Sequence, residues 1–274
     1  MRFFKCIPCL LGLLLIAGCS KQPEKKVNYF KRDEFKQSKT FKLVHHMPYD
    51  ELKEEKAQLL AEDNKYIAIK YVVQMIKKCE DPDDLRDLRL EYADMLFDLE
   101  RLEEAATEYQ MFVQLYPASD QAPYADFHAI ESLYSQVMQA DRDQEKTHEV
   151  IEQAKDYAKK AKWHKDYDKF MEKVEDMTHG SLKRLYDSEL LRFYFYLNRG
   201  NCKAAVGRLQ FIKENYLPYL DEIKPEVLEL EYELACESRQ PAEAKTKQKE
   251  LRKDYPKYTC NPGKRRHYAS LFTL

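Results

Sequence analysis

The chain has 274 residues, of which 44% are hydrophobic and 34% charged, and its formal net charge is −2. This length suits one elongated domain or two compact ones, and the slightly acidic balance argues against nucleic acid as a partner. Only 6 glycines are set against 20 tyrosines and 13 phenylalanines, which favours packed helices over a turn-rich β fold, so we expect an all-α protein.

The N-terminal segment 1–18 has the pattern of a secretory leader. Arg2 and Lys5 supply positive charge, and an apolar run from Cys6 to Gly18 follows them. That run is too short to span a bilayer, because a transmembrane helix needs about 20 apolar residues. We therefore expect residues 1–18 to be a signal peptide that is removed.

The end of this leader resembles a bacterial lipobox, in which the cysteine is acylated and becomes the mature N-terminus. Its residues are Ile16-Ala17-Gly18-Cys19. The resemblance implies lipidation of Cys19. Because Ser20 stands where an aspartate would favour retention in the inner membrane, it also implies an outer-membrane anchor on the periplasmic side. The alternative is an ordinary signal peptide in which Cys19 is incidental.

The next segment, 19–46, shows no sustained helical pattern and holds eight Lys or Arg against three acidic residues. We interpret it as a flexible, lipidated tether with a root-mean-square reach of roughly 30 Å. Its basic residues could also contact an anionic lipid surface. The His45-His46 pair has no Cys or His partner at metal-ligand spacing, so we expect no metal site there.

From 47 to 256 the pattern predicts pairs of helices. In one copy, a first helix ends near Asp98, and a second helix ends at Tyr116-Pro117, because proline cannot continue it. A small or β-branched residue recurs at the equivalent place in five second helices, at Ala68, Ala105, Val150, Ala205 and Ala244. The spacings of 37, 45, 55 and 39 residues predict a helix-pair repeat with insertions, followed by a tail at 257–274.

Each such pair leaves an apolar face that only the next pair can bury, which is why these arrays form solenoids. The pattern resembles the tetratricopeptide repeat and implies a solenoid of about five repeats. An ordinary helical bundle is the alternative.

Two further phrases narrow the resemblance, "AIESLYSQVMQADRDQEKTHEVIEQAKDY" from 129 to 157 and "FYFYLNRGNCKAAVGRLQFIKENY" from 193 to 216. With the lipobox, they resemble the BamD family of tetratricopeptide lipoproteins. The resemblance implies a non-enzymatic scaffold of the machinery that assembles outer-membrane β-barrels. It also implies binding to the barrel-forming BamA-like subunit, to other machinery subunits and to client proteins. The alternative is another periplasmic repeat lipoprotein that serves cell division or envelope maintenance.

The resemblance also implies two sets of contact residues. Arg208 matches an arginine of the family and would dock the fourth and fifth repeats onto a BamA domain, where its guanidinium could grip a carboxylate with two hydrogen bonds. The alternative is an exposed arginine paired with a local glutamate such as Glu214. In tetratricopeptide solenoids the first helices of successive pairs line the concave face. Five residues of these helices would face client proteins there: Leu90, Phe97, Tyr124, Phe127 and Tyr134. Each of these five could instead belong to the core.

No cofactor is expected, because no phosphate-binding loop, Ser-His-Asp order or metal-ligand spacing can be singled out. A peptidoglycan-cleaving enzyme is the rival, since its catalytic glutamate precedes a serine, as at Glu131-Ser132 and Glu237-Ser238. Both pairs fall inside expected helices, with no glycine-rich loop to build a sugar cleft. We therefore expect a chain that is not an enzyme.

Four cysteines remain beyond the leader and its end: Cys79, Cys202, Cys236 and Cys260. They allow three complete pairings, between which the sequence does not choose. A disulfide between Cys202 and Cys236 would join neighbouring antiparallel helices. Two unpaired thiols are the alternative.

Overall fold

The computed structural model describes residues 44–260. The expected signal peptide 1–18, the expected lipidation site Cys19, the expected tether up to residue 43 and the tail from residue 261 lie outside the described residues. The chain divides into two compact units, Met1–His46 and Met47–Leu274. None of the helices in the described part has the length and apolarity needed to cross a bilayer.

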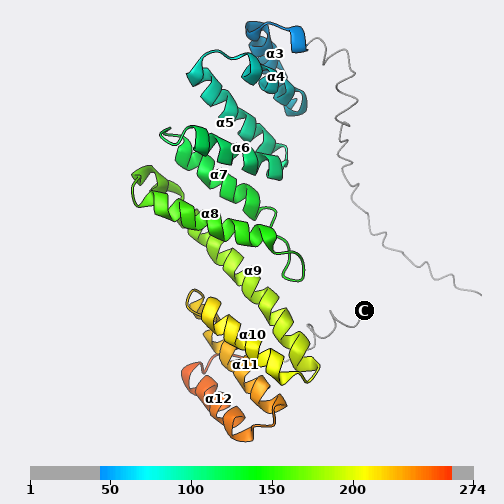
Figure 1. The fold of residues 1–274 in the computed structure, drawn as a ribbon, viewed down its shortest axis with the longest axis vertical. Helices are drawn as coiled ribbons and strands as arrows, with labels where there is room; N and C mark the ends of the chain where they lie inside the picture. The colour runs from blue at the N-terminus through cyan, green and yellow to red at the C-terminus, as the bar shows by residue number, and fades with distance from the viewer. Residues whose placement is uncertain (1–43, 261–274) are drawn as a thin grey trace, which may run out of the picture. The chain divides into compact units, whose positions relative to one another are not determined.

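Residues 44–260 fold mainly into helices and contain no strand, which confirms the predicted all-α class. Each α-helix packs against the one that follows it in the chain (Figure 1). The helices are α3 (Tyr49–Ala61), α4 (Lys65–Lys78), α5 (Pro82–Asp98), α6 (Leu102–Leu115), α7 (Ala122–Tyr134), α8 (Glu145–Ala161), α9 (Met171–Asn198), α10 (Cys202–Asn215), α11 (Lys224–Glu237) and α12 (Pro241–Asp254), with short 3-10 helices η1 (Lys165–Phe170) and η2 (Asp221–Ile223).

The residues at the five repeat positions are all buried. Ala68, Ala105, Val150 and Ala205 are 0% exposed and Ala244 is 7% exposed, and they lie in α4, α6, α8, α10 and α12. A small side chain at a helix contact lets the facing helix approach closely, which explains why these positions recur. The structure thus has successive neighbouring helix pairs, an arrangement compatible with a helical-repeat solenoid.

Local sequence signals set the helix ends. Helices α6 and α12 stop immediately before Tyr116-Pro117 and Tyr255-Pro256, as predicted. The segment before α5 has no such stop and instead carries a start signal. The Asp81 carboxylate accepts hydrogen bonds from the backbone N–H groups of Asp83 and Asp84, each at 2.9 Å, and Pro82 occupies the first turn.

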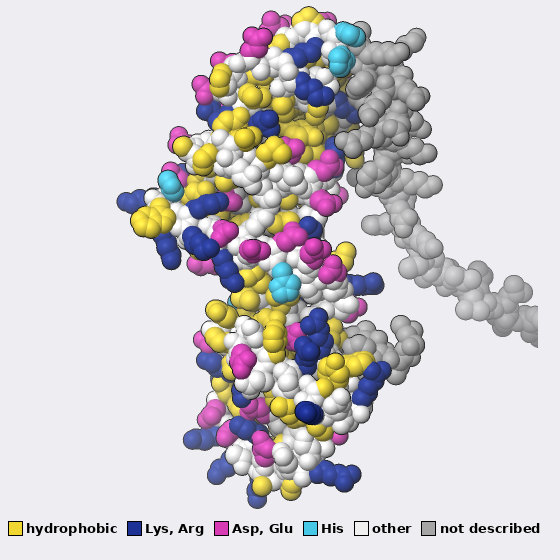
Figure 2. Space-filling model, viewed as in Figure 1, with side chains coloured by type: hydrophobic (Ala, Val, Ile, Leu, Met, Phe, Trp, Pro, Cys, Tyr) yellow, Lys and Arg dark blue, Asp and Glu magenta, His cyan; other side chains and the backbone are white. Residues whose placement is uncertain are grey.

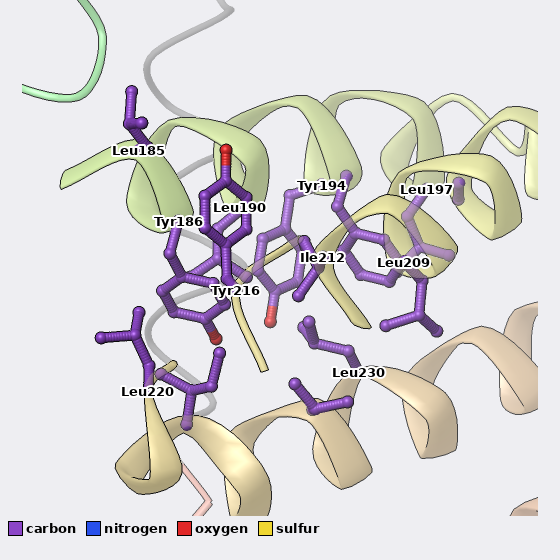
Figure 3. Close-up of a cluster of buried hydrophobic side chains, with 14 of the residues drawn as sticks. Leu185, Tyr186, Leu190, Tyr194, Leu197, Leu209, Ile212, Tyr216, Leu220 and Leu230 are labelled. Atoms are coloured by element: carbon purple, nitrogen blue, oxygen red, sulfur yellow. The ribbon is translucent and has the colours of Figure 1, made fainter. Parts of the chain in front are cut away.

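The longest of these helices, α9, contributes to two hydrophobic cores. Its 28 residues extend over about 42 Å at 1.5 Å per residue. Near its start, Val174 and Met177 join a core with side chains from α6, α7, α8 and η1. Its second half packs with α10 and α11 in the other core, where Figure 3 shows Leu185, Tyr186, Leu190, Tyr194, Leu197, Leu209, Ile212 and Leu230 close together.

Enlarging Ala205 tests the close approach of the helices. Its side chain is fully buried in this second core, so Ala205→Phe should overpack it and lower the free energy of unfolding by about 1 to 3 kcal/mol. The matched control is Val206→Phe, because Val206 is the next residue of α10 and is 51% exposed. The free energy of unfolding, measured with urea, should fall clearly more in Ala205→Phe than in Val206→Phe. Equal effects would contradict the packing account.

Candidate docking site

A tight turn joins α9 to α10 and brings the candidate residue Arg208 back along α9. Gly200 adopts a left-handed conformation with φ of 70°, which glycine accepts without steric cost. The Asn201 N–H donates to the carbonyl of Tyr196 at 3.0 Å, and the Asn201 side chain accepts from the N–H of Ala204 at 3.1 Å. The Arg-Gly-Asn phrase is therefore a helix stop followed by a helix start.

On α10, Leu209 and Ile212 are buried as expected, and the Arg208 side chain remains 38% exposed. Its Nη1 lies 3.5 Å from Oε2 of Glu189 on α9. Glu214, the local partner considered from the sequence, instead accepts a hydrogen bond from Gln210 at 2.6 Å. The carboxylate that orients Arg208 thus comes from the preceding helix.

Glu189 is a buried carboxylate shared by two arginines. Its side chain is 5% exposed, and it pairs with Arg192 through one oxygen and with Arg208 through the other. A buried charge needs such partners, since burying it alone is very costly. Two guanidinium groups against one carboxylate leave a net positive charge. The contact with Arg208 is at the long end for a hydrogen bond, which leaves N–H donors of that guanidinium able to bind a second carboxylate.

Arg208 lies in a shallow depression of about 340 Å³ that is also lined by Tyr196, Ala204, Gly207 and Phe211. A Cβ added to Gly207 would meet no atom within 4 Å, and Phe211 is 39% exposed. The surface thus combines an available positive charge with apolar contact area. Such a surface can bind a partner's acidic side chain together with its apolar neighbours.

The five expected client-facing residues differ in exposure. Leu90 and Phe127 are 6% and 2% exposed, so the core interpretation holds for these two. Phe97 and Tyr124 are half-buried, and Tyr134 is 37% exposed. Tyr134 contacts α9, because a Cβ added to Gly180 would lie 2.5 Å from its hydroxyl oxygen. An exposed contact surface in this region therefore reduces to Tyr134 and the outer edges of Phe97 and Tyr124.

Sequence reasoning missed His128, which lies at the centre of a cluster joining α5, α6 and α7. Four aromatic rings surround its imidazole at centroid distances of 4.2 to 5.6 Å, from Phe97, Tyr109, Tyr124 and Phe127. Nδ1 of His128 lies 2.8 Å from Oε2 of Glu131, without the alignment of a hydrogen bond. A lone histidine within an apolar pattern gave no signal that could have singled it out.

Asp94 supplies the polar contacts of this cluster. Its Oδ1 accepts hydrogen bonds from the hydroxyl groups of Tyr109 at 2.7 Å and Tyr124 at 3.1 Å. Burial raises the pKa of Asp94, although the two tyrosine hydrogen bonds oppose this. Burial lowers the pKa of His128, although the nearby carboxylates of Glu131 and Asp94 oppose this. The cluster is a polar network inside a helix interface, and its hydrogen bonds link three consecutive helices.

The other candidate residues are not brought together. All four cysteines beyond the leader and its end have free thiols, with Cys202 half-buried and Cys236 exposed, and a disulfide between Cys202 and Cys236 stays a prediction. Glu131 and Ser132 lie inside α7, and Glu237 is the last residue of α11. Within residues 44–260, His, Cys, Asp and Glu side chains form no group of three or more that could hold a metal ion.

No protein-family model matches the chain. No curated protein matches it either.

The His128 cluster predicts a pH dependence of stability. Because the folded pKa of His128 is below the ordinary 6.5, the unfolded chain binds more protons than the folded one between these values. The free energy of unfolding should therefore fall as the pH drops below about 6.5, and His128→Gln should reduce this fall. Urea unfolding at a series of pH values above and below about 6.5 measures the free energy of unfolding of both proteins.

The control is His148→Gln, at an exposed histidine outside the cluster. On acidification, the free energy of unfolding should fall less in His128→Gln than in this variant. If the free energy of unfolding of His128→Gln changed with pH as steeply as that of the wild type, burial of this imidazole would not control the acid sensitivity.

Proposed function

We propose that this chain is a non-enzymatic scaffold lipoprotein of the BamD type. In this role it is anchored by acylated Cys19 in the outer membrane, and a tetratricopeptide-type array binds the barrel-forming BamA-like subunit and client segments on the periplasmic side. The leader pattern supports the anchor. The five buried repeat positions and the two Tyr-Pro helix ends support the tetratricopeptide type.

The observation that carries the proposal is the placement of Arg208. The family resemblance is most specific in the phrase from 197 to 216, and this phrase builds the turn, the start of α10 and the depression around Arg208. The buried Glu189 orients the guanidinium without neutralising both arginines. An exposed ion pair contributes under about 1 kcal/mol to stability. An arginine that served only in such a pair would not need a buried carboxylate as its partner.

Replacing Arg208 tests the docking role. Arg208→Leu should weaken capture of a BamA-like periplasmic domain by about 2 to 5 kcal/mol, because the partner's carboxylate would lose its charged partner on burial. Affinity is measured with purified proteins, and circular dichroism checks that helical content is unchanged.

Arg192→Leu is the matched control, because it removes the other guanidinium from Glu189 outside the residues that line the depression. It should weaken capture less than Arg208→Leu does. Wild-type capture by the Arg208→Leu protein would reject the docking role and leave a different periplasmic adaptor as the better proposal.

Lipidation is tested separately at Cys19. Cys19→Ala removes the thiol that would receive lipid, so the protein should move from the membrane fraction to the soluble fraction after cell lysis. Mass spectrometry of the wild-type N-terminus should find acylated Cys19. A mature N-terminus at another residue would contradict the lipobox interpretation.

A further inference from the structure

The end of α8 carries a strongly basic segment with an exposed tryptophan. Residues 159–165, "KKAKWHK", hold four lysines and no acidic residue, a charge of +4, whereas the whole chain has −2. Trp163, the one tryptophan of the sequence, is 84% exposed. We call residues 159–165 the Trp163 loop. Such exposure is unusual for the largest apolar side chain and requires an explanation.

The fold fixes this loop. The N–H of Trp163 donates to the carbonyl of Lys160 at 2.9 Å, and the N–H of His164 donates to the same carbonyl at 3.0 Å. Just after the loop, Tyr167 is 5% exposed, and its carbonyl accepts a hydrogen bond from the hydroxyl of Tyr157 at 2.9 Å. The indole therefore projects from a hydrogen-bonded turn that is anchored in a core.

Two of the four lysines have structural partners and two do not. Lys160 contacts the carboxylate of Asp126 at 2.6 Å, and Lys159 pairs with Asp156 at 2.7 Å. Lys162 and Lys165 are exposed and have no ion-pair partner within residues 44–260. Where the end of α8 lies in Figure 1, Figure 2 shows basic side chains gathered around a projecting hydrophobic one.

We propose that the Trp163 loop binds the surface of an anionic phospholipid membrane. Tryptophan is enriched at membrane–water interfaces, where its apolar ring enters the lipid and its N–H stays near the headgroups. Each lysine near an anionic lipid surface adds attraction, and Lys162 and Lys165 have charges that no carboxylate of the described residues pairs. Protein interfaces are also enriched in tryptophan but depleted in lysine, so the unpaired Lys162 and Lys165 on either side of Trp163 in the chain favour lipid over a protein partner. This proposal does not depend on docking of a BamA-like subunit.

The test uses Trp163 as its own probe. The full chain with Cys19→Ala, which cannot be acylated, is added to phosphatidylcholine vesicles or to vesicles of equal parts phosphatidylcholine and phosphatidylglycerol. With the anionic vesicles, the emission of Trp163 should shift to shorter wavelength, and lipids with brominated chains should quench it. Because the sequence has one tryptophan, the signal reports this loop alone even if the leader also binds.

Charge reversal at the unpaired lysines should weaken this binding. Each lysine near an anionic surface contributes about fivefold in affinity, so Lys162→Glu with Lys165→Glu should lower the vesicle affinity by at least about 25-fold. The matched control is Lys245→Glu with Lys249→Glu, which makes the same charge change at exposed positions of α12. The control should stay within about fivefold of the parent chain.

Three results would overturn the proposal. The first is unchanged Trp163 emission with anionic vesicles, and the second is an equal shift with neutral vesicles. The third is an emission shift that appears only when a BamA-like periplasmic domain is added, which would assign the loop to a protein interface.

Discussion

The packing of α9 into two hydrophobic cores is the constraint on which the other features depend. The start of this helix shares a core with side chains of α6, α7 and α8, and its second half shares another core with side chains of α10 and α11. A continuous helix transmits position along its length, because each backbone hydrogen bond fixes the next turn. The two cores of the helix array are therefore joined by one continuous helix.

Each candidate surface contacts α9 or the core around it. Glu189 of α9 orients Arg208, and Gly180 of α9 receives the hydroxyl of Tyr134. Tyr167, which anchors the Trp163 loop, shares a core with Val174 of α9. The surfaces proposed for a protein partner and for lipid thus depend on the same helix. Damage to its packing should affect all of them together, whereas substitutions on the surfaces should separate them.

The sequence predicted what local chemistry determines. Small residues at equivalent helix positions and proline after tyrosine have direct steric effects, so the buried repeat positions and two helix ends could be anticipated. Contacts between helices could not be anticipated from the sequence. Glu189 contacts Arg208, and Glu214 does not, because the turn at Gly200 brings α10 back along α9. Nor could burial be assigned on α5 and α7. These helices have neighbours on both sides, which bury Leu90 and Phe127 and leave Tyr134 exposed.

The central claim is that the helix array is a scaffold of the barrel-assembly machinery. The most direct measurement is purification of the wild-type chain from detergent-solubilised cell envelopes, with its partners identified by mass spectrometry. The account predicts that a BamA-like barrel-forming protein and other assembly subunits are recovered with it. Recovery of cell-division or peptidoglycan proteins, without any barrel-assembly subunit, would contradict it.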